Sequence, residues 1–172
     1  HPWIAYNAAK SSLGALILSH TGQFVLVPIQ NMTPQDVRYT ISRCKLYIDF
    51  GTHPGRDRLP REAVLSSCLI VTGLEGAAGN KIDIPIPGRY KMSLNELQKS
   101  SQRIHALMEN YDTNIGDFRP YSNSIHRQKG QFKQEVKALI SAVETPDFYT
   151  RHLFIEPEID NFLLKQEILQ RE

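Results

Sequence analysis

The stretch KLYIDFGTHPGRDRLPREAVLSSCLIVTG, from Lys45 to Gly73, decides the fold of this 172-residue chain. Its apolar run LYIDF leads into a segment with two glycines and three arginines, and a helix start, a small-residue turn and a second apolar run follow. This order is strand, loop, helix, strand. In a parallel sheet such a loop stands at the carboxyl end of a strand, where the N–H groups of the following helix attract negative charge. The stretch therefore predicts a site for a phosphorylated small molecule.

The residues before this stretch repeat the same alternation. Strand patterns cover 3–7 and 23–29, and helical patterns cover 8–20 and 34–44, the second of them opened by Thr33 as N-cap and a proline in the first turn. Four strands that alternate with three helices are typical of a parallel sheet with right-handed crossovers. The fold class that we predict is α/β, a Rossmann-like parallel sheet flanked by helices, with a C-terminal helical extension.

The residues after Gly73 are less regular. We expect a loop with a short extended piece at 81–86, then a helix from Ser93 to about 111, and a second one over about 122–143. A third, amphipathic helix is expected after Pro146. We accordingly divide the chain into a Rossmann-like core that carries the expected phosphate-ligand site, 1–90, and a helical C-terminal part of the same domain, 91–172. The inward-facing residues expected on the second helix are Ile125, Phe132, Val136, Leu139 and Ile140.

Composition places limits on the class of protein. With 41% hydrophobic and 22% charged residues the chain suits one compact domain, and its net charge of +2 is too small to indicate nucleic-acid or membrane-surface binding. The longest apolar run is too short to span a membrane. Cys44 and Cys68 lie among apolar residues, where we expect free, buried thiols, with a disulfide as the alternative. Because free thiols suit a reducing compartment, we expect a cytoplasmic protein.

The segment from Tyr47 to Gly73 resembles the donor-binding half of GT-B-type glycosyltransferases. HPGRDRLPREAVLSSCLIVTG keeps that family's proline, its Glu-Ala pair (Glu62 and Ala63) and the turn before the next strand. The resemblance implies that Glu62 accepts hydrogen bonds from the ribose hydroxyls, which suits a carboxylate facing a vicinal diol. It also implies that the loop from Gly51 to Gly55 lies under the sugar diphosphate.

The opening YNAAKSSLGAL is similar to the first strand-to-helix turn of the same donor domain. The resemblance implies that Lys10 meets the diphosphate, and that Arg56 and Arg58 add charge-assisted hydrogen bonds. The chain departs from the family at the first acidic residue of its paired-glutamate motif, which falls at His53 or Pro54. The contact to the donor sugar then passes to His53 or Asp57, which are the candidate catalytic residues.

Each of these residues also has a purely structural alternative. Glu62 suits the first turn of a helix, Lys10 suits a solvated helix face, and Asp57 is placed to pair with its arginine neighbours. Asp49 either faces the ligand end of the sheet or is satisfied by the neighbouring backbone. No spacing of His105, His126 and His152 indicates a metal site, so none is expected.

Two functions remain open from the sequence. The first is the donor-binding domain of a glycosyltransferase, which transfers a sugar from a nucleoside diphosphate sugar to an unknown acceptor without further cofactor. The acceptor domain is then expected from an N-terminal domain or a dimer partner. The alternative is a non-catalytic nucleotide or phosphate-ligand binding or interaction module, so whether the chain is an enzyme stays open. A doubly wound domain of the response-regulator or phosphatase type ranks last, because no strand end offers paired aspartates.

Overall fold

A computed structural model describes residues 3–20, 24–99 and 101–143. The chain divides into two compact units, 1–126 and 127–172, and each is described by itself. Over the described ranges, no helix combines the length and the apolar character that crossing a lipid bilayer requires.

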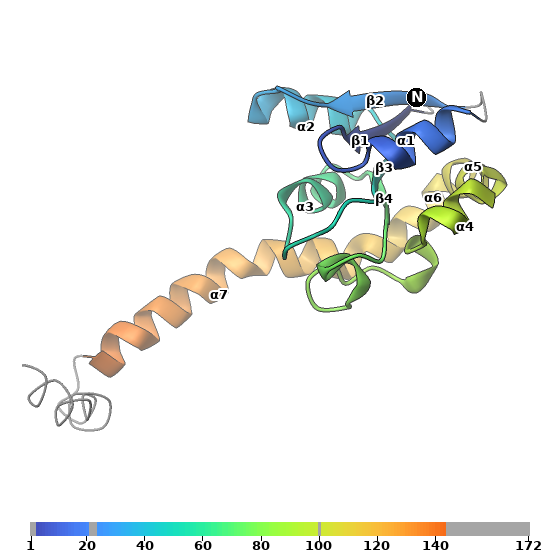
Figure 1. Ribbon diagram of the computed structural model, residues 1–172. Helices are drawn as coiled ribbons and strands as arrows, with labels where there is room; N and C mark the ends of the chain where they lie inside the picture. Colours follow the sequence, from blue (N-terminus) through green and yellow to red (C-terminus); the bar gives the residue numbers. More distant parts are fainter. Residues whose placement is uncertain (1–2, 21–23, 100, 144–172) are drawn as a thin grey trace, which may run out of the picture. The chain divides into compact units, whose positions relative to one another are not determined.

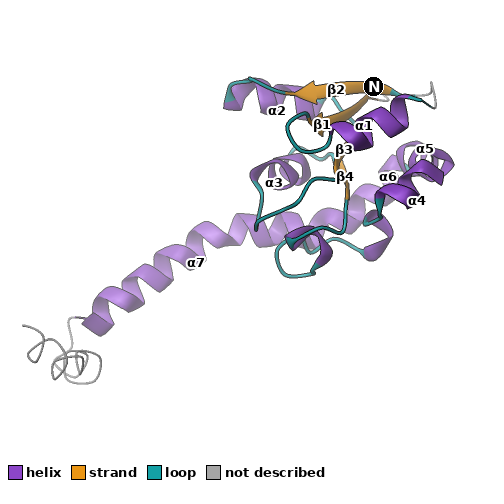
Figure 2. Cartoon of the chain, in the orientation of Figure 1, coloured by secondary structure: helices purple, strands orange, loops and turns teal. Residues whose placement is uncertain are grey.

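The first unit is built on a four-stranded parallel sheet (Figures 1 and 2). Its strands are β1 (Trp3–Asn7), β2 (Val25–Ile29), β3 (Leu46–Asp49) and β4 (Leu69–Thr72), in the spatial order β2-β1-β3-β4. The predicted fold class, a Rossmann-like α/β sheet flanked by helices, is confirmed.

The burial of the strands follows their sequence. Every residue of β3 and β4 is buried, as their continuous apolar runs predict for strands covered on both faces. The edge strand β2 instead exposes Val25 and carries Pro28 opposite Tyr6. Since proline has no N–H to donate to a neighbour, it is tolerated on an edge strand.

Three helices connect the strands. They are α1 (Ser12–Ser19), α2 (Pro34–Ser42) and α3 (Arg58–Leu65). Helix α2 contacts α3 on one side of the sheet, whereas α1 contacts α4 (Leu94–Lys99) on the other (Figure 1). Both faces of the sheet are therefore covered.

The first turn of each connection is set by local hydrogen bonds. The side chain of Thr33 accepts from the N–H of Asp36 at 3.2 Å, which confirms the predicted cap of α2. Helix α1 begins four residues later than expected, because the N–H groups of Lys10 and Ser11 both bond to the Asn7 carbonyl in a turn.

The segment after β4 corrects one prediction. Residues 81–86 form turns and loop rather than the expected extended piece. The side-chain oxygen of Asn80 accepts from the N–H groups of Ile82 and Asp83, at 2.8 Å each, and this bends the chain where a strand was expected. Two 3₁₀ turns, η1 (Ala77–Gly79) and η2 (Gly88–Tyr90), flank it.

Helical structure completes the first unit. It comprises α4, α5 (Ser101–Glu109), α6 (Tyr111–Asn114), the 3₁₀ turn η3 (Ile115–Phe118) and the start of α7 (Arg119–Val143). Ser93 and Glu96 form the predicted capping box at α4. Within α5, Ile104, Leu107 and Met108 are buried as expected.

The described part of the second unit, 127–143, continues α7. Ile125, just before it, is buried as expected, but the prediction was wrong for the apolar residues beyond. These residues are exposed, since nothing in their own unit's described part covers them: Phe132, Val136, Leu139 and Ile140. The amphipathic helix expected after Pro146 lies outside the described residues.

Both cysteines are free thiols, as expected. Each is buried among apolar residues, and burial raises the pKa of Cys44 to about 11. The pKa of Cys68 is also raised, first by burial and then by Cys44. The alternative of a disulfide between them is therefore wrong.

Candidate functional site

The topology places a pocket between the two central strands. Strands β1 and β3 are neighbours, but the chain leaves β1 toward β2 and leaves β3 toward β4. Loops that diverge in this way open a crevice at the carboxyl ends of parallel strands. A pocket of about 180 Å³ lies there, lined by Asn7, Lys10, Asp49, Asp57, Arg58 and Leu59.

The two loops that border this pocket are in close contact. A Cβ on Gly51 would collide with the Cβ of Lys10 and lie 2.9 Å from the Lys10 carbonyl oxygen. Nearby, the N–H of Phe50 donates to Ser11 Oγ at 2.9 Å. Gly55, at the other end of the same loop, has open space where a side chain would stand. Gly51 is thus required for the contact between the loops, whereas Gly55 is not.

Lys10 forms an ion pair within the pocket. Its Nζ lies 2.8 Å from Oδ2 of Asp57, a carboxylate at the N-cap position of α3. Asp57 makes no hydrogen bond to the helix N-terminus from this position, and its carboxylate turns toward Lys10 instead. The first turn of α3, which lines the pocket through Arg58 and Leu59, therefore has no side-chain cap.

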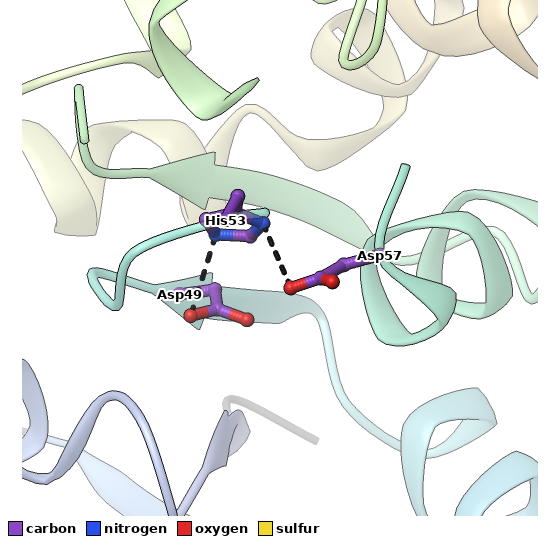
Figure 3. A group of neighbouring side chains, drawn as sticks. All are labelled: Asp49, His53 and Asp57. Carbon is purple, nitrogen blue, oxygen red and sulfur yellow. Dashed lines mark ion pairs between the residues drawn. The ribbon is translucent and has the colours of Figure 1, made fainter. Parts of the chain in front are cut away.

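His53 lies between two carboxylates (Figure 3). Its Nδ1 is 3.1 Å from Oδ2 of Asp57, and its Nε2 is 3.5 Å from Oδ1 of Asp49. The side chains of His53 and Asp49 are fully buried, while that of Asp57 is 20% exposed. Although these distances are short, neither ring nitrogen makes a hydrogen bond of good geometry within the described chain.

Asp49 is held in place by its own neighbours. Its Oδ2 accepts from the Tyr47 hydroxyl at 2.7 Å, and its Oδ1 accepts from the N–H of Gly51 at 3.2 Å. Burial, followed by the Asp49 carboxylate, raises the pKa of Tyr47 well above its usual value. Both alternatives for Asp49 hold, since the Gly51 N–H satisfies it and it also lines the pocket, although it was not among the predicted site residues. The signal was a carboxylate at the end of a wholly apolar strand.

The loop that carries His53 is also fixed from its other side. The N–H of His53 donates to the Glu75 carbonyl at 3.4 Å, and the N–H of Ala77 donates to the His53 carbonyl at 2.8 Å. Between them Gly76 has a φ of 62°, and a Cβ there would collide with the His53 carbonyl oxygen. The backbone on both sides therefore holds His53 in place.

The arginines and Glu62 pair differently from what the sequence predicted. Neither ion pair found for Arg56 and Arg58 involves Asp57, because Arg56 Nε lies 3.4 Å from Asp83 Oδ1 and Arg58 Nε lies 3.4 Å from Glu62 Oε1. The other oxygen of Glu62, Oε2, is buried with no hydrogen-bond partner among the described residues. One acceptor thus remains on Glu62, next to an arginine of the pocket.

The predicted site residues gather only in part. Lys10, Asp57 and Arg58 line one pocket. Gly51 is in close contact with Lys10, and His53 contacts Asp57. Glu62 reaches the pocket through Arg58, whereas Arg56 points to Asp83.

Comparison with known proteins adds one likeness. No protein-family model and no curated protein matches this sequence. Among solved structures, the chain is similar to Anabaena HepE in its complex with UDP-glucose, at 16% identity and a TM-score of 0.49, covering 80% of this chain. The chain spans 40% of the length of that protein.

Proposed function

We propose that this chain binds a nucleoside diphosphate sugar as the donor-binding part of a GT-B-type glycosyltransferase. The observation that carries the proposal is the pocket at the ends of β1 and β3, where Lys10 faces the uncapped N-terminus of α3. An ammonium and the positive end of a helix both favour an anion. A diphosphate supplies that charge.

Glu62 supports the sugar-nucleotide half of the proposal. Its Oε1 contacts Arg58, which lines the pocket, and its Oε2 lacks a partner. A carboxylate with an unpaired oxygen suits a ribose diol once movement of Arg58 exposes that buried oxygen, and this is also the role that the family resemblance implies. In the bound state Arg58 would turn from Glu62 toward the phosphates.

The reaction follows from the position of these charges. As the sugar carbon forms its bond to the acceptor hydroxyl oxygen, its bond to the diphosphate breaks, the electron pair stays on the phosphate, and the hydroxyl proton passes to a base, the role proposed here for Asp57 or His53. Lys10 and Arg58 would stabilise this developing charge, which is the largest single contribution that such a site can make. The acceptor would be held by an N-terminal domain or a dimer partner. His53 and Asp57 remain the candidate catalytic residues of this proposal.

Calorimetric titration tests the proposal. The purified chain is titrated with UDP, GDP, ADP and their sugar conjugates, alongside Lys10→Met and Glu62→Gln. We expect one nucleotide to bind and each variant to weaken binding by about 10- to 100-fold, since a hydrogen bond to a charged group contributes about 1.5–3 kcal/mol. Glu109→Gln, an exposed carboxylate of α5, is the matched control and leaves the affinity unchanged. Absence of binding, or equal binding by Lys10→Met, would contradict the proposal.

One observation favours the alternative, a module that binds the nucleotide without catalysis. His53 stands where the family has its sugar-contacting acid, but its side chain is fully buried and is not among the residues that line the pocket. Measuring release of nucleoside diphosphate from the bound sugar conjugate separates the two. Binding with no release, with and without candidate acceptors, would favour the non-catalytic module.

A further inference from the structure

The three side chains Asp49, His53 and Asp57 bring two carboxylates and one imidazole together in a largely buried cluster. Asp49 is fully buried, and a buried carboxylate is costly unless a positive partner lies close. Asp57 already has Lys10 as its partner. The side chain paired with Asp49 is His53, and neither of its ring nitrogens makes a hydrogen bond of good geometry within the described part of the chain. The buried carboxylate and the buried imidazole therefore lie close together without a bond between them.

The distances in the cluster match those of a metal site. One ligand atom from each of the three residues can be chosen so that all lie within 4.8 Å of one another. One metal ion binds one of the two imidazole nitrogens. With Nε2 as the ligand, its 3.5 Å separation from Oδ1 of Asp49 matches the roughly 3.3–3.6 Å expected between ligands that bind zinc tetrahedrally at about 2.0–2.2 Å. The Asp57 carboxylate instead faces the other nitrogen, Nδ1, at 3.1 Å. A small movement of the Asp57 side chain would close the set.

We propose that Asp49, His53 and Asp57 bind one divalent transition-metal cation. An imidazole nitrogen with two carboxylate oxygens is a donor set that suits Zn²⁺. Since the Asp57 carboxylate is partly exposed and lines the pocket, water or a ligand oxygen can reach a remaining coordination position from that side. The proposal concerns the metal alone and holds whether or not a nucleotide sugar binds.

The surroundings of the cluster supply the support that a metal site needs. Ligand carboxylates are usually oriented by further hydrogen bonds, and Asp49 receives two, from the Tyr47 hydroxyl and the Gly51 N–H. His53 is fixed through its backbone by Glu75 and Ala77. Two of the three ligands are thus held in place before a cation arrives.

Lys10 is a competitor of the cation. Its ammonium contacts the same oxygen, Oδ2 of Asp57, that lies nearest to His53. A cation that binds Asp57 must share this carboxylate with Lys10 or displace it. Removal of the ammonium should therefore strengthen metal binding, a result that no merely structural role of the cluster predicts.

Titration of the 172-residue chain with ZnCl₂ alone, followed by calorimetry, tests the proposal. We expect one Zn²⁺ per chain, with Co²⁺ giving d–d absorption bands that Zn²⁺ abolishes. Tyr47→Phe removes a hydrogen bond to the ligand Asp49 and should weaken Zn²⁺ binding by about 10-fold. His53→Ala removes a ligand and should weaken it by more than the about 10- to 100-fold that the loss of a hydrogen bond to a ligand costs. Lys10→Met should bind several-fold more tightly. His126→Ala, on the exposed side of α7, is the matched control and should bind as the unchanged protein does.

Two results would overturn the proposal. One is the absence of stoichiometric Zn²⁺ binding by the unchanged protein. That result would mean that the His53 imidazole alone, without a metal, lies between the two carboxylates. The other is equal binding by His53→Ala, which would assign the metal to a surface site. Circular dichroism establishes that each variant folds. If His53→Ala does not fold, the Zn²⁺ affinity of Tyr47→Phe tests the proposal instead, because this variant loses only one hydroxyl group. Unaltered Zn²⁺ binding by Tyr47→Phe would then overturn the proposal.

Discussion

Helix α5 and the second half of α7 carry the same kind of apolar pattern with opposite outcomes. In α5, Ile104, Leu107 and Met108 are buried in the core of the first unit. In α7, Phe132 and Leu139 are 66% and 60% exposed. A helical period of apolar residues thus predicts a helix and its apolar face, but it does not predict what covers that face.

The largest test of this comparison is a pair of matched truncations. Ile70→Ala, in the wholly buried strand β4, should lower the free energy of unfolding by about 2–5 kcal/mol, because it removes apolar contacts and leaves a cavity. Leu139→Ala, on the exposed face of α7, should change it by less than about 0.5 kcal/mol. Urea denaturation measures both. A cost for Leu139→Ala near that of Ile70→Ala would mean that this face of α7 is covered after all.

A second pair of variants tests which part of the loop from Gly51 to Gly55 is tightly packed in the first unit. Gly51→Ala should cost about 1–3 kcal/mol, since its Cβ would collide with Lys10 and force two loops apart. Gly55→Ala, four residues on, meets open space and should stay within about 0.5 kcal/mol of the unchanged protein. Chemical denaturation of both variants checks this. Equal costs would show that backbone freedom, rather than loop contact, decides the effect.

The smallest effect concerns a partly exposed polar contact between η2 and η3. The Tyr90 hydroxyl and then the Arg89 guanidinium donate to Asp117, which lowers the pKa of that carboxyl below 3.8. Because the folded pKa lies below the unfolded one, the carboxylate stabilises the fold above pH 4, and this contribution is lost as the pH falls through the folded pKa. Since the carboxylate is one-third exposed, the contribution should be below about 1 kcal/mol.

Thermal melting of Asp117→Asn at pH 7 and at pH 2.5 measures this effect. The variant should melt below the unchanged protein at pH 7, and the gap should narrow at pH 2.5. A gap that stays the same at both pH values would rule out the ionised carboxylate as its source.

Much of the fold was predictable because it follows from local rules. Strand patterns, the Thr33 cap and the Ser93 capping box were each confirmed. The loop at 81–86 was not, because one side chain, that of Asn80, outweighs an alternating apolar pattern.

The candidate site was predictable in its location but less so in its contacts. The carboxyl end of β3 was identified from glycines and arginines, and Lys10 and Arg58 do line the pocket there. The ion pairs of Arg58 and Arg56, and the approach of His53 to Asp49, depend on where separate loops cross in space. No spacing along the chain encodes those crossings.

The ion pair between Lys10 and Asp57 has a consequence for selectivity. The pocket carries its own monovalent anion at the ammonium, so an entering anion must replace that carboxylate or share the ammonium with it. Chloride or an acetate-like ligand gains no charge by the exchange, whereas a phosphate dianion gains one. Under the proposed function, this exchange would favour a phosphate dianion over a monovalent anion before shape or hydrogen bonding distinguishes them.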